Sequence, residues 1–98
     1  MPVLMVMEWD GVTPEQYEAA RELVKWETDV APGGLFHVAA FGEKGLRVVD
    51  VWESAEQFQS FIQTRLMPGV KQVGLQGEPK VQIYPVHRLF SPAYERVG

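Results

Sequence analysis

A histidine and an aspartate are expected to stand opposite each other in a β-hairpin over residues 34–54. Two apolar runs flank a Gly-Glu-Lys-Gly segment at 42–45, whose composition is typical of a tight turn. If the two glycines face each other, His37 pairs with Asp50. A carboxylate beside an imidazole fixes its tautomer and raises its basicity, as a general base requires. The pair could therefore take a proton from a phenol or an activated carbon acid.

The same pair has an interpretation without a reaction. A cross-strand hydrogen bond between His37 and Asp50 would satisfy two polar groups at an interface between subunits. Both interpretations depend on the register, because a one-residue slip would move one partner to the other face. In the expected register Leu35 pairs with Trp52, and one face holds Leu35, His37, Ala39, Phe41, Leu46, Val48, Asp50 and Trp52.

A second histidine, His87, alternates with the apolar residues of an expected last strand from Lys80 to Phe90. Together with His37 and Asp50 it would make two histidines and a carboxylate, a set that can bind ferrous iron. The alternative is a structural histidine. On its side of the strand His87 could also share the pocket and contact a substrate. We expect no metal ion and no other cofactor.

Two charged residues, Glu27 and Arg65, fall within the apolar sides of the expected helices. A charge buried alone costs several kcal/mol, so each needs a partner. We expect them to pair with each other, or Arg65 to reach Asp50, or both side chains to extend to water. If they face a cavity, Arg65 could hold a substrate carboxylate or an oxyanion.

Aromatic residues are numerous enough to form the walls of a pocket for a flat aromatic ligand. Aromatic residues at helical and strand spacing can equally be ordinary core, and only the cavity volume separates the two possibilities. The candidates for the wall are Trp9, Trp26, Trp52, Phe58, Phe61 and Tyr84.

The positions of these residues follow from six expected elements. An apolar run from Val3 to Trp9 predicts a buried strand. A capping box at 13–16 opens a helix that should end near Thr28 or Asp29. After the hairpin, a second hydroxyl cap at 54–57 opens another helix, which the Met-Pro-Gly segment at 67–69 should stop or kink.

The last strand contains Pro85, which cannot donate to a ladder and is therefore expected at a sheet edge or a bulge. The order strand, helix, strand, strand, helix, strand predicts an α+β, ferredoxin-like βαββαβ domain over residues 1–90, followed by a C-terminal tail at 91–98. Its four-stranded antiparallel sheet would carry both helices on one face. The other face is apolar as well, because the hairpin places Phe36, Val38, Ala40, Val49 and Val51 there.

An apolar face that no helix covers needs a partner, and a second copy of the chain is the economical one. We therefore expect a homodimer that forms an α/β barrel. With a formal charge of -4 and a pI near 5.1, neither nucleic acid nor an anionic membrane is an expected partner. The sequence has no cysteine, no membrane-length apolar run and no basic segment at Met1. A cytoplasmic location is expected.

The segment VVDVWESAEQFQSF resembles the small dimeric α/β-barrel proteins of the antibiotic biosynthesis monooxygenase type. In these an acidic residue, one spacer and a tryptophan lead from a strand into an acidic, apolar helix. The resemblance implies an obligate dimer with one pocket per subunit between helices and sheet. Some members oxidise aromatic polyketides with oxygen and no cofactor. The matching residues are Asp50, Trp52, Ser54, Glu56, Phe58 and Phe61.

Relatives of this fold that degrade haem differ at three places. Their first-strand asparagine has no counterpart, since this strand offers Met5, Met7 and Glu8. Phe61 replaces their helix tryptophan, and Lys71 stands where they carry the histidine that binds iron. These differences disfavour haem degradation.

Two classes of function follow. The first is a cofactor-independent monooxygenase acting on a hydrophobic aromatic molecule, with His37 as base and Asp50 orienting it. Arg65 would contact an anion, and Trp52, Phe58 and Phe61 would form walls. The second is a non-catalytic protein that binds a small molecule or another protein, in which the polar pair only adjusts the dimer interface.

Overall fold

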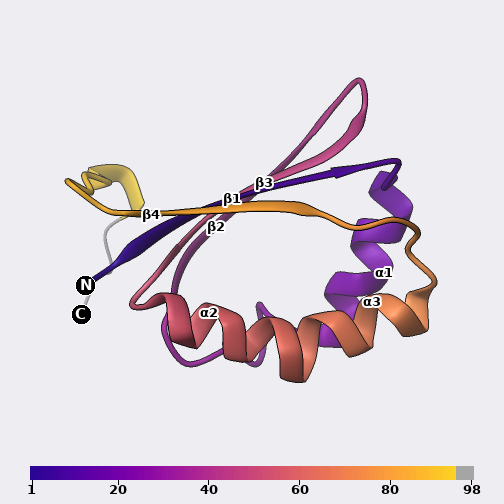
Figure 1. Ribbon diagram of the computed structural model, residues 1–98, viewed down its shortest axis with the longest axis horizontal. Helices are drawn as coiled ribbons and strands as arrows, with labels where there is room; N and C mark the ends of the chain where they lie inside the picture. The colour runs from indigo at the N-terminus through magenta and orange to yellow at the C-terminus, as the bar shows by residue number, and fades with distance from the viewer. Residues whose placement is uncertain (95–98) are drawn as a thin grey trace.

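A four-stranded sheet forms one layer of the molecule, and the helices form the other (Figure 1). The computed structural model describes residues 1–94, so residues 95–98 of the expected tail lie outside the described part. The elements in chain order are β1 (Val3–Asp10), α1 (Pro14–Val24), β2 (Gly34–Gly42), β3 (Gly45–Trp52), α2 (Ala55–Phe61), the π-helical turn η1 (Ile62–Leu66), α3 (Met67–Val73), β4 (Lys80–Pro85) and the 3-10 turn η2 (Pro92–Tyr94).

The sheet has the order β2-β3-β1-β4, and every neighbouring pair is antiparallel. All of the α-helices lie on the same side of it (Figure 1). This is the predicted α+β, ferredoxin-like arrangement. It places β3, which carries Asp50, between β2 and β1 in the sheet that the helices cover on one face.

The fourth strand is at the sheet edge, as Pro85 predicts, but it is shorter than expected. It ends at Pro85 and not at Phe90. The reason lies in its neighbour: Val3 of β1 pairs with Pro85, and a last backbone bond joins the amide of Val86 to the carbonyl of Pro2. Beyond that point β1 has no residues left to pair with.

The hairpin register is confirmed through most of its length. Gly42 faces Gly45, and His37 faces Asp50. Near the open end the prediction is wrong, because Gly34 and not Leu35 lies opposite Trp52. A β-bulge inserts Leu35 as an unpaired residue, which shifts the last pairing by one position.

The first helix begins as predicted, with the reciprocal capping box of Thr13 and Gln16. It ends at Val24, earlier than the expected Thr28 or Asp29. Lys25 adopts a left-handed conformation with φ of 63°, and its amide donates to the carbonyl of Arg21. Tertiary packing overrides the helical periodicity here, and the residues from Trp26 onward leave the helix axis.

The second helix begins with the hydroxyl of Ser54 accepting from the amide of Gln57, as predicted. The segment at 67–69 does not stop it. The ribbon runs without a break from α2 through η1 into α3 (Figure 1), and Pro68 lies in the first turn of α3. A proline inside a helix lacks the amide that would donate to the carbonyl four residues earlier. Here the π-helical turn η1 precedes Pro68 and changes the backbone hydrogen-bond pattern at this point. Gly74 then ends the helix with φ of 91°.

The core lies between the helices and the inner face of the sheet. Met5, Met7 and Trp9 of β1 and Leu46 and Val48 of β3 are buried there. No helix in residues 1–94 is long and apolar enough to cross a membrane.

The outer face of the sheet carries rows of apolar side chains. The Cα register places Val6, Val49 and Val38 in one row and Leu4 and Val51 in the next. Val49 and Val38 are 38% and 45% exposed. This face is therefore apolar and partly open in the single chain, as the hairpin pattern predicts.

Candidate functional site

A cavity of about 290 Å³ lies between the sheet and the helices, on the inner side of β3. Its walls are mostly apolar and aromatic, and they include side chains from β1, α1, β3, α2 and α3. Polar groups enter it at only a few points. Its lining includes Met5, Met7, Trp9, Tyr17, Trp26, Glu27, Ala31, His37, Val48, Asp50, Trp52, Phe58, Phe61, Leu66 and Val70.

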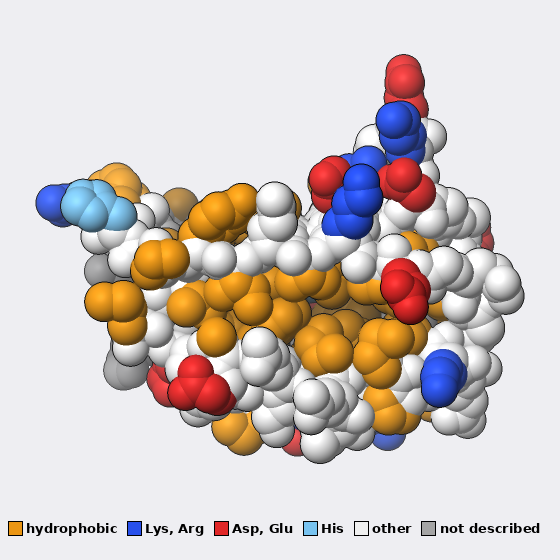
Figure 2. All heavy atoms as spheres, in the orientation of Figure 1, with side chains coloured by type: hydrophobic (Ala, Val, Ile, Leu, Met, Phe, Trp, Pro, Cys, Tyr) orange, Lys and Arg blue, Asp and Glu red, His pale blue; other side chains and the backbone are white. Residues whose placement is uncertain are grey.

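A second groove runs between β4 and the segment from α2 to α3, where Figure 2 shows apolar side chains gathered in the gap. Met7, Phe58 and Leu66 line both spaces. Within residues 1–94, no charged side chain lines this groove. The imidazole and the carboxylates therefore belong to the first cavity.

Four side chains form a continuous hydrogen-bonded chain along the first cavity. The Tyr17 hydroxyl lies 2.8 Å from Nε2 of His37, and Nδ1 of His37 lies 2.6 Å from Oδ1 of Asp50. The other carboxylate oxygen of Asp50 accepts from the indole N–H of Trp52 at 3.1 Å. The chain joins α1, β2 and β3, and its carboxylate side chain is only 10% exposed.

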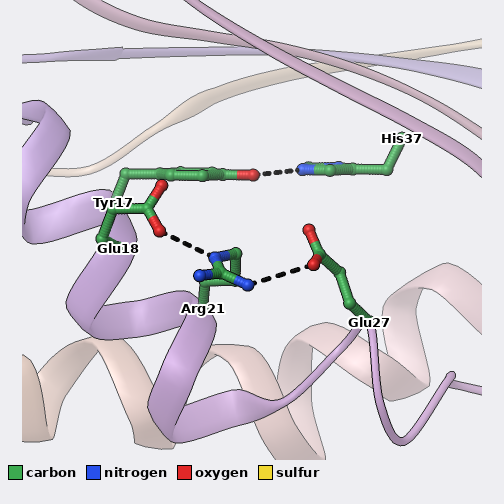
Figure 3. Close-up of polar contacts among 5 residues, drawn as sticks. All are labelled: Tyr17, Glu18, Arg21, Glu27 and His37. Atoms are coloured by element: carbon green, nitrogen blue, oxygen red, sulfur yellow. Dashed lines mark hydrogen bonds and ion pairs between the residues drawn. The ribbon is translucent and has the colours of Figure 1, made fainter.

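The partners of His37 assign its protons. A carboxylate can only accept, so Nδ1 carries the hydrogen that binds Asp50. In the neutral imidazole Nε2 is then an acceptor, and the Tyr17 hydroxyl donates to it. The two rings are coplanar within 1°, which aligns them end to end for this bond (Figure 3). The arrangement leaves a lone pair on the Tyr17 oxygen for a further partner.

Burial raises the pKa of the Tyr17 hydroxyl from 10.0 to about 12, and the carboxylates of Glu27 and Glu18 add to the shift. Tyr17 therefore stays neutral at physiological pH. The sequence analysis did not identify Tyr17 as a site residue. Its hydroxyl on an apolar helix face was the available signal.

Glu27 lines the cavity, yet its partner is not the predicted one. Arg21 of α1 donates to Glu27 at 3.0 Å and to Glu18 at 2.8 Å. Figure 3 shows this cluster beside the bond between Tyr17 and His37, with the Glu27 carboxylate directed toward it. The Glu27 side chain is 56% exposed, so the cluster stands at the solvent side of the site.

Arg65 pairs with neither Glu27 nor Asp50, which corrects both predicted pairings. Its Nη2 donates to the carbonyls of Val24 and Asp29, at 2.8 and 2.7 Å, and its guanidinium lies over the ring of Phe61. Arg65 is not among the residues that line the cavity. Instead, its hydrogen bonds connect the turn after α1 to the π-helical turn η1.

The remaining predicted residues divide into two groups. Trp52, Phe58 and Phe61 line the cavity, with Trp52 against both phenylalanine rings at centroid distances of 5.6 and 5.4 Å. His87 lies beyond the end of β4, is exposed and does not line the cavity, so it does not join His37 and Asp50. Tyr84 is 46% exposed and pairs with Leu4, away from the cavity.

Residues 1–94 contain no group of three or more His, Asp or Glu side chains placed to hold a metal ion. The iron-binding set considered from the sequence fails for a geometric reason. β4 ends before His87, so the second histidine never reaches the inner face of the sheet.

No protein-family model and no curated protein matches this chain, but solved structures do. SnoaB, a cofactor-independent oxygenase from Streptomyces nogalater, superposes with a TM-score of 0.66 at 14% identity, covering 93% of this chain and 97% of SnoaB. A protein from Nitrosomonas europaea, provisionally described as an antibiotic biosynthesis monooxygenase, has a TM-score of 0.61 at 13% identity over 90% of this chain and 100% of its own.

The chain has the fold of the antibiotic biosynthesis monooxygenase-like proteins. The haem-degrading protein Rv3592 from Mycobacterium tuberculosis shares this monooxygenase-like fold, with a TM-score of 0.58 at 22% identity over 93% of this chain and 97% of that one. At these identities the likeness concerns the fold, and the chemistry has to be argued from the cavity.

We expect Arg65→Ala to lower the free energy of unfolding by about 2 kcal/mol, because it removes charged hydrogen bonds to two backbone carbonyls. Chemical denaturation of both proteins measures this. Lys71→Ala, which removes an exposed cation from α3, is the control and should change stability little. Equal stability of Arg65→Ala and wild type would contradict the assigned role.

The raised pKa of Tyr17 predicts a pH dependence at alkaline pH. The folded state holds the phenolic proton more tightly than the unfolded state, so this stabilisation is complete below pH 10 and is lost as the pH rises from 10 to about 12. The difference in tyrosinate absorbance between wild type and Tyr17→Phe reports the ionisation of Tyr17, and it should increase near pH 12. An increase near pH 10 would contradict the burial of the hydroxyl.

Proposed function

We propose that this protein is a cofactor-independent oxygenase acting on a small, hydrophobic aromatic molecule. The observation that supports this most directly is the base at the cavity wall, His37, oriented by Asp50 at 2.6 Å and connected through Tyr17 to an apolar space. The monooxygenase-like fold is consistent with the proposal.

The cavity suits a flat apolar ligand. Its volume of about 290 Å³ is at the lower end of typical ligand pockets, about 300–1,000 Å³. Trp52, Phe58 and Phe61 offer ring faces and edges to an aromatic molecule. A ligand of two or three fused rings matches this space better than a larger one.

Removal of a substrate proton is the first step that these residues support. A phenol or enol of the substrate passes its proton to the Tyr17 oxygen while the Tyr17 proton passes to Nε2 of His37. Tyr17 is neutral before and after, so no tyrosinate forms, which its raised pKa would oppose. Asp50 stabilises the resulting imidazolium.

The substrate anion is then electron-rich enough to reduce dioxygen. For a methylene carbon the balance is R₂CH₂ + O₂ → R₂C=O + H₂O: one oxygen atom enters the product and the other leaves as water. The substrate itself is oxidised and supplies the electrons. The protein contributes the base, the orientation and a cavity with mostly apolar walls.

Haem is a poorer candidate for the substrate. A porphyrin macrocycle is larger than the fused aromatic ligands that a cavity of about 290 Å³ suits. Both ring nitrogens of His37 already have partners, and Lys71 is exposed on α3 and does not line the cavity. We therefore do not propose haem degradation, although Rv3592 shares the fold.

Binding without turnover is the second candidate function. The observation in its favour is that the Tyr17 hydroxyl occupies Nε2 of His37, the nitrogen that a base must have available. In that case the cavity would hold a ligand, and the hydrogen-bonded chain would only fix the shape of its wall.

The test uses anthrone, whose acidic methylene group and fused rings fit the proposed substrate class. Wild type should accelerate oxygen uptake and anthraquinone formation, and His37→Gln should lower kcat by about a hundredfold or more. His87→Gln, which changes the histidine outside the cavity, is the control and should retain full activity. Anthrone that binds without oxygen uptake would favour the binding function, and equal rates for His37→Gln and wild type would exclude His37 as the base.

We also propose that two copies pair through the outer faces of their sheets. Val38 and Val49 are partly open there, and Tyr84 is 46% exposed on the edge strand. A charged row flanks the apolar rows, since Arg47 lies 3.0 Å from Asp10 and 3.7 Å from Glu8. An apolar centre with a charged border is typical of an interface.

This pairing predicts a dimer in solution. Val49→Glu should convert it to a monomer, because the new carboxylate would be desolvated at the centre of the interface. Light scattering coupled to gel filtration measures the mass. Ser60→Glu adds the same charge on the exposed surface of α2 and should leave the dimer intact. A monomeric wild type, or a dimeric Val49→Glu variant, would contradict the proposed interface.

A further inference from the structure

The charged side chains that line the cavity are carboxylates. Among the described residues 1–94, Glu27 and Asp50 line it, and no lysine or arginine does. Both oxygens of Asp50 are engaged, one with His37 and the other with Trp52. With His37 in its neutral form, the lining therefore carries two negative charges and no positive one. A charged ligand that enters the cavity meets a negative potential.

Glu27 is the carboxylate that a ligand can reach. Its side chain lines the cavity and is 56% exposed. Oε1 accepts from Arg21 at 3.0 Å, and Figure 3 shows the second oxygen turned toward the bond between Tyr17 and His37. Arg21 also donates to Glu18 at 2.8 Å. One guanidinium is thus shared by two carboxylates, so this group of three side chains keeps a net negative charge.

Aromatic rings stand beside the Glu27 carboxylate. Trp26 precedes it in the chain, and the Trp26 ring centroid lies 5.6 Å from that of Tyr17 and 5.6 Å from that of His37. After burial, Glu27 is the next cause of the raised pKa of Tyr17, so its charge acts on this part of the wall. The face of an aromatic ring attracts a cation within about 6 Å of its centroid, most strongly for tryptophan. Ring faces and a carboxylate together suit an organic ammonium ion.

An anionic ligand does not find a matching group in this cavity. The cation predicted from the sequence to contact an anion, Arg65, donates to backbone carbonyls and does not line the cavity. A carboxylate or phosphate on the ligand would lose its hydration and face Glu27 and Asp50. The arrangement of charges therefore favours a cationic ligand over an anionic one.

We infer that the cavity takes a ligand that carries a positively charged amine, with the ammonium group between Glu27 and the rings of Tyr17 and Trp26. This inference rests on the proposed function for the apolar, aromatic part of the ligand and adds its charge. The ammonium donates to the second oxygen of Glu27. Its positive charge also stabilises the anion that forms when the base removes the ligand's acidic proton, so it lowers the pKa of that group.

Three ligands with one ring system and different charges isolate this contact. At neutral pH 1-naphthylmethylamine is a cation, 1-naphthalenemethanol is neutral and 1-naphthoate is an anion. Wild-type protein should bind the amine about tenfold more tightly than the alcohol, and the carboxylate more weakly than the alcohol. Calorimetry measures the three Kd values. Equal affinity for amine and alcohol, tightest binding of the carboxylate, or binding of none of the three would overturn the inference.

Two glutamine variants separate a direct contact from a general field. Glu27→Gln keeps the size of the side chain and should weaken amine binding about tenfold, with unchanged affinity for the alcohol. Glu18→Gln is the matched control, because it removes the same charge from the other partner of Arg21, which does not line the cavity. It should keep the preference for the amine. An equal loss in both variants, or no loss in Glu27→Gln, would overturn the assignment to Glu27.

The role of the ring has its own variant. Trp26→Leu removes the aromatic face, so the ratio of amine affinity to alcohol affinity should fall about threefold. The ratio is the readout because both ligands lose the same apolar contact with the indole. An unchanged ratio would overturn the contact between the ammonium group and Trp26.

Oxygen uptake separates the inference from the proposed function. A protein that prefers the amine through Glu27 but takes up no oxygen with anthrone would support the ammonium site and overturn the oxygenase function. A protein that oxidises anthrone but shows no preference for the amine would overturn the inference alone. A protein that does neither would overturn both.

Discussion

The site depends on a carboxylate placed where a protein of this size would ordinarily bury an apolar side chain. Asp50 points from the central part of the sheet into the core, and its two oxygens accept from His37 and Trp52. A buried carboxylate without partners would cost several kcal/mol, so these bonds are a condition of folding as well as of chemistry. They orient the imidazole, and the imidazole in turn orients Tyr17. Every polar group in the proposed proton path is therefore positioned by one aspartate.

The second constraint is the turn that follows α1. A longer helix would keep Trp26 and Glu27 on the helix, whereas after the left-handed Lys25 the chain leaves the helix axis and lines the cavity. Arg65 stabilises this turn from the opposite helical segment. It lies in the π-helical turn η1, which precedes Pro68. The irregular turn after α1 and the π-helical turn η1 thus both contribute residues to the cavity wall, and the regular sheet forms the opposite wall.

The two faces of the sheet have different tasks. The inner face supplies the cavity, and the outer face presents valines bordered by charged residues, which suits a second sheet. SnoaB shares this architecture at 14% identity. Such low identity means that the scaffold tolerates almost complete replacement of its side chains, so the function of each chain depends on the few polar groups in its cavity.

Local rules were sufficient for much of this protein. Turn glycines and strict alternation determined the pairing of His37 with Asp50, and capping residues determined where both helices begin. Long-range contacts decided the rest: α1 ends at Val24, Leu35 is bulged, and Arg65 binds the backbone carbonyls of Val24 and Asp29 and not the carboxylates of Glu27 or Asp50. The hydrogen bond between Tyr17 and His37 and the lack of an acceptor for the indole N–H of Trp26 also depend on the tertiary structure. The physical reason is that strand register and helix caps are set by neighbours in sequence, whereas side-chain partners across layers are set by how the layers pack.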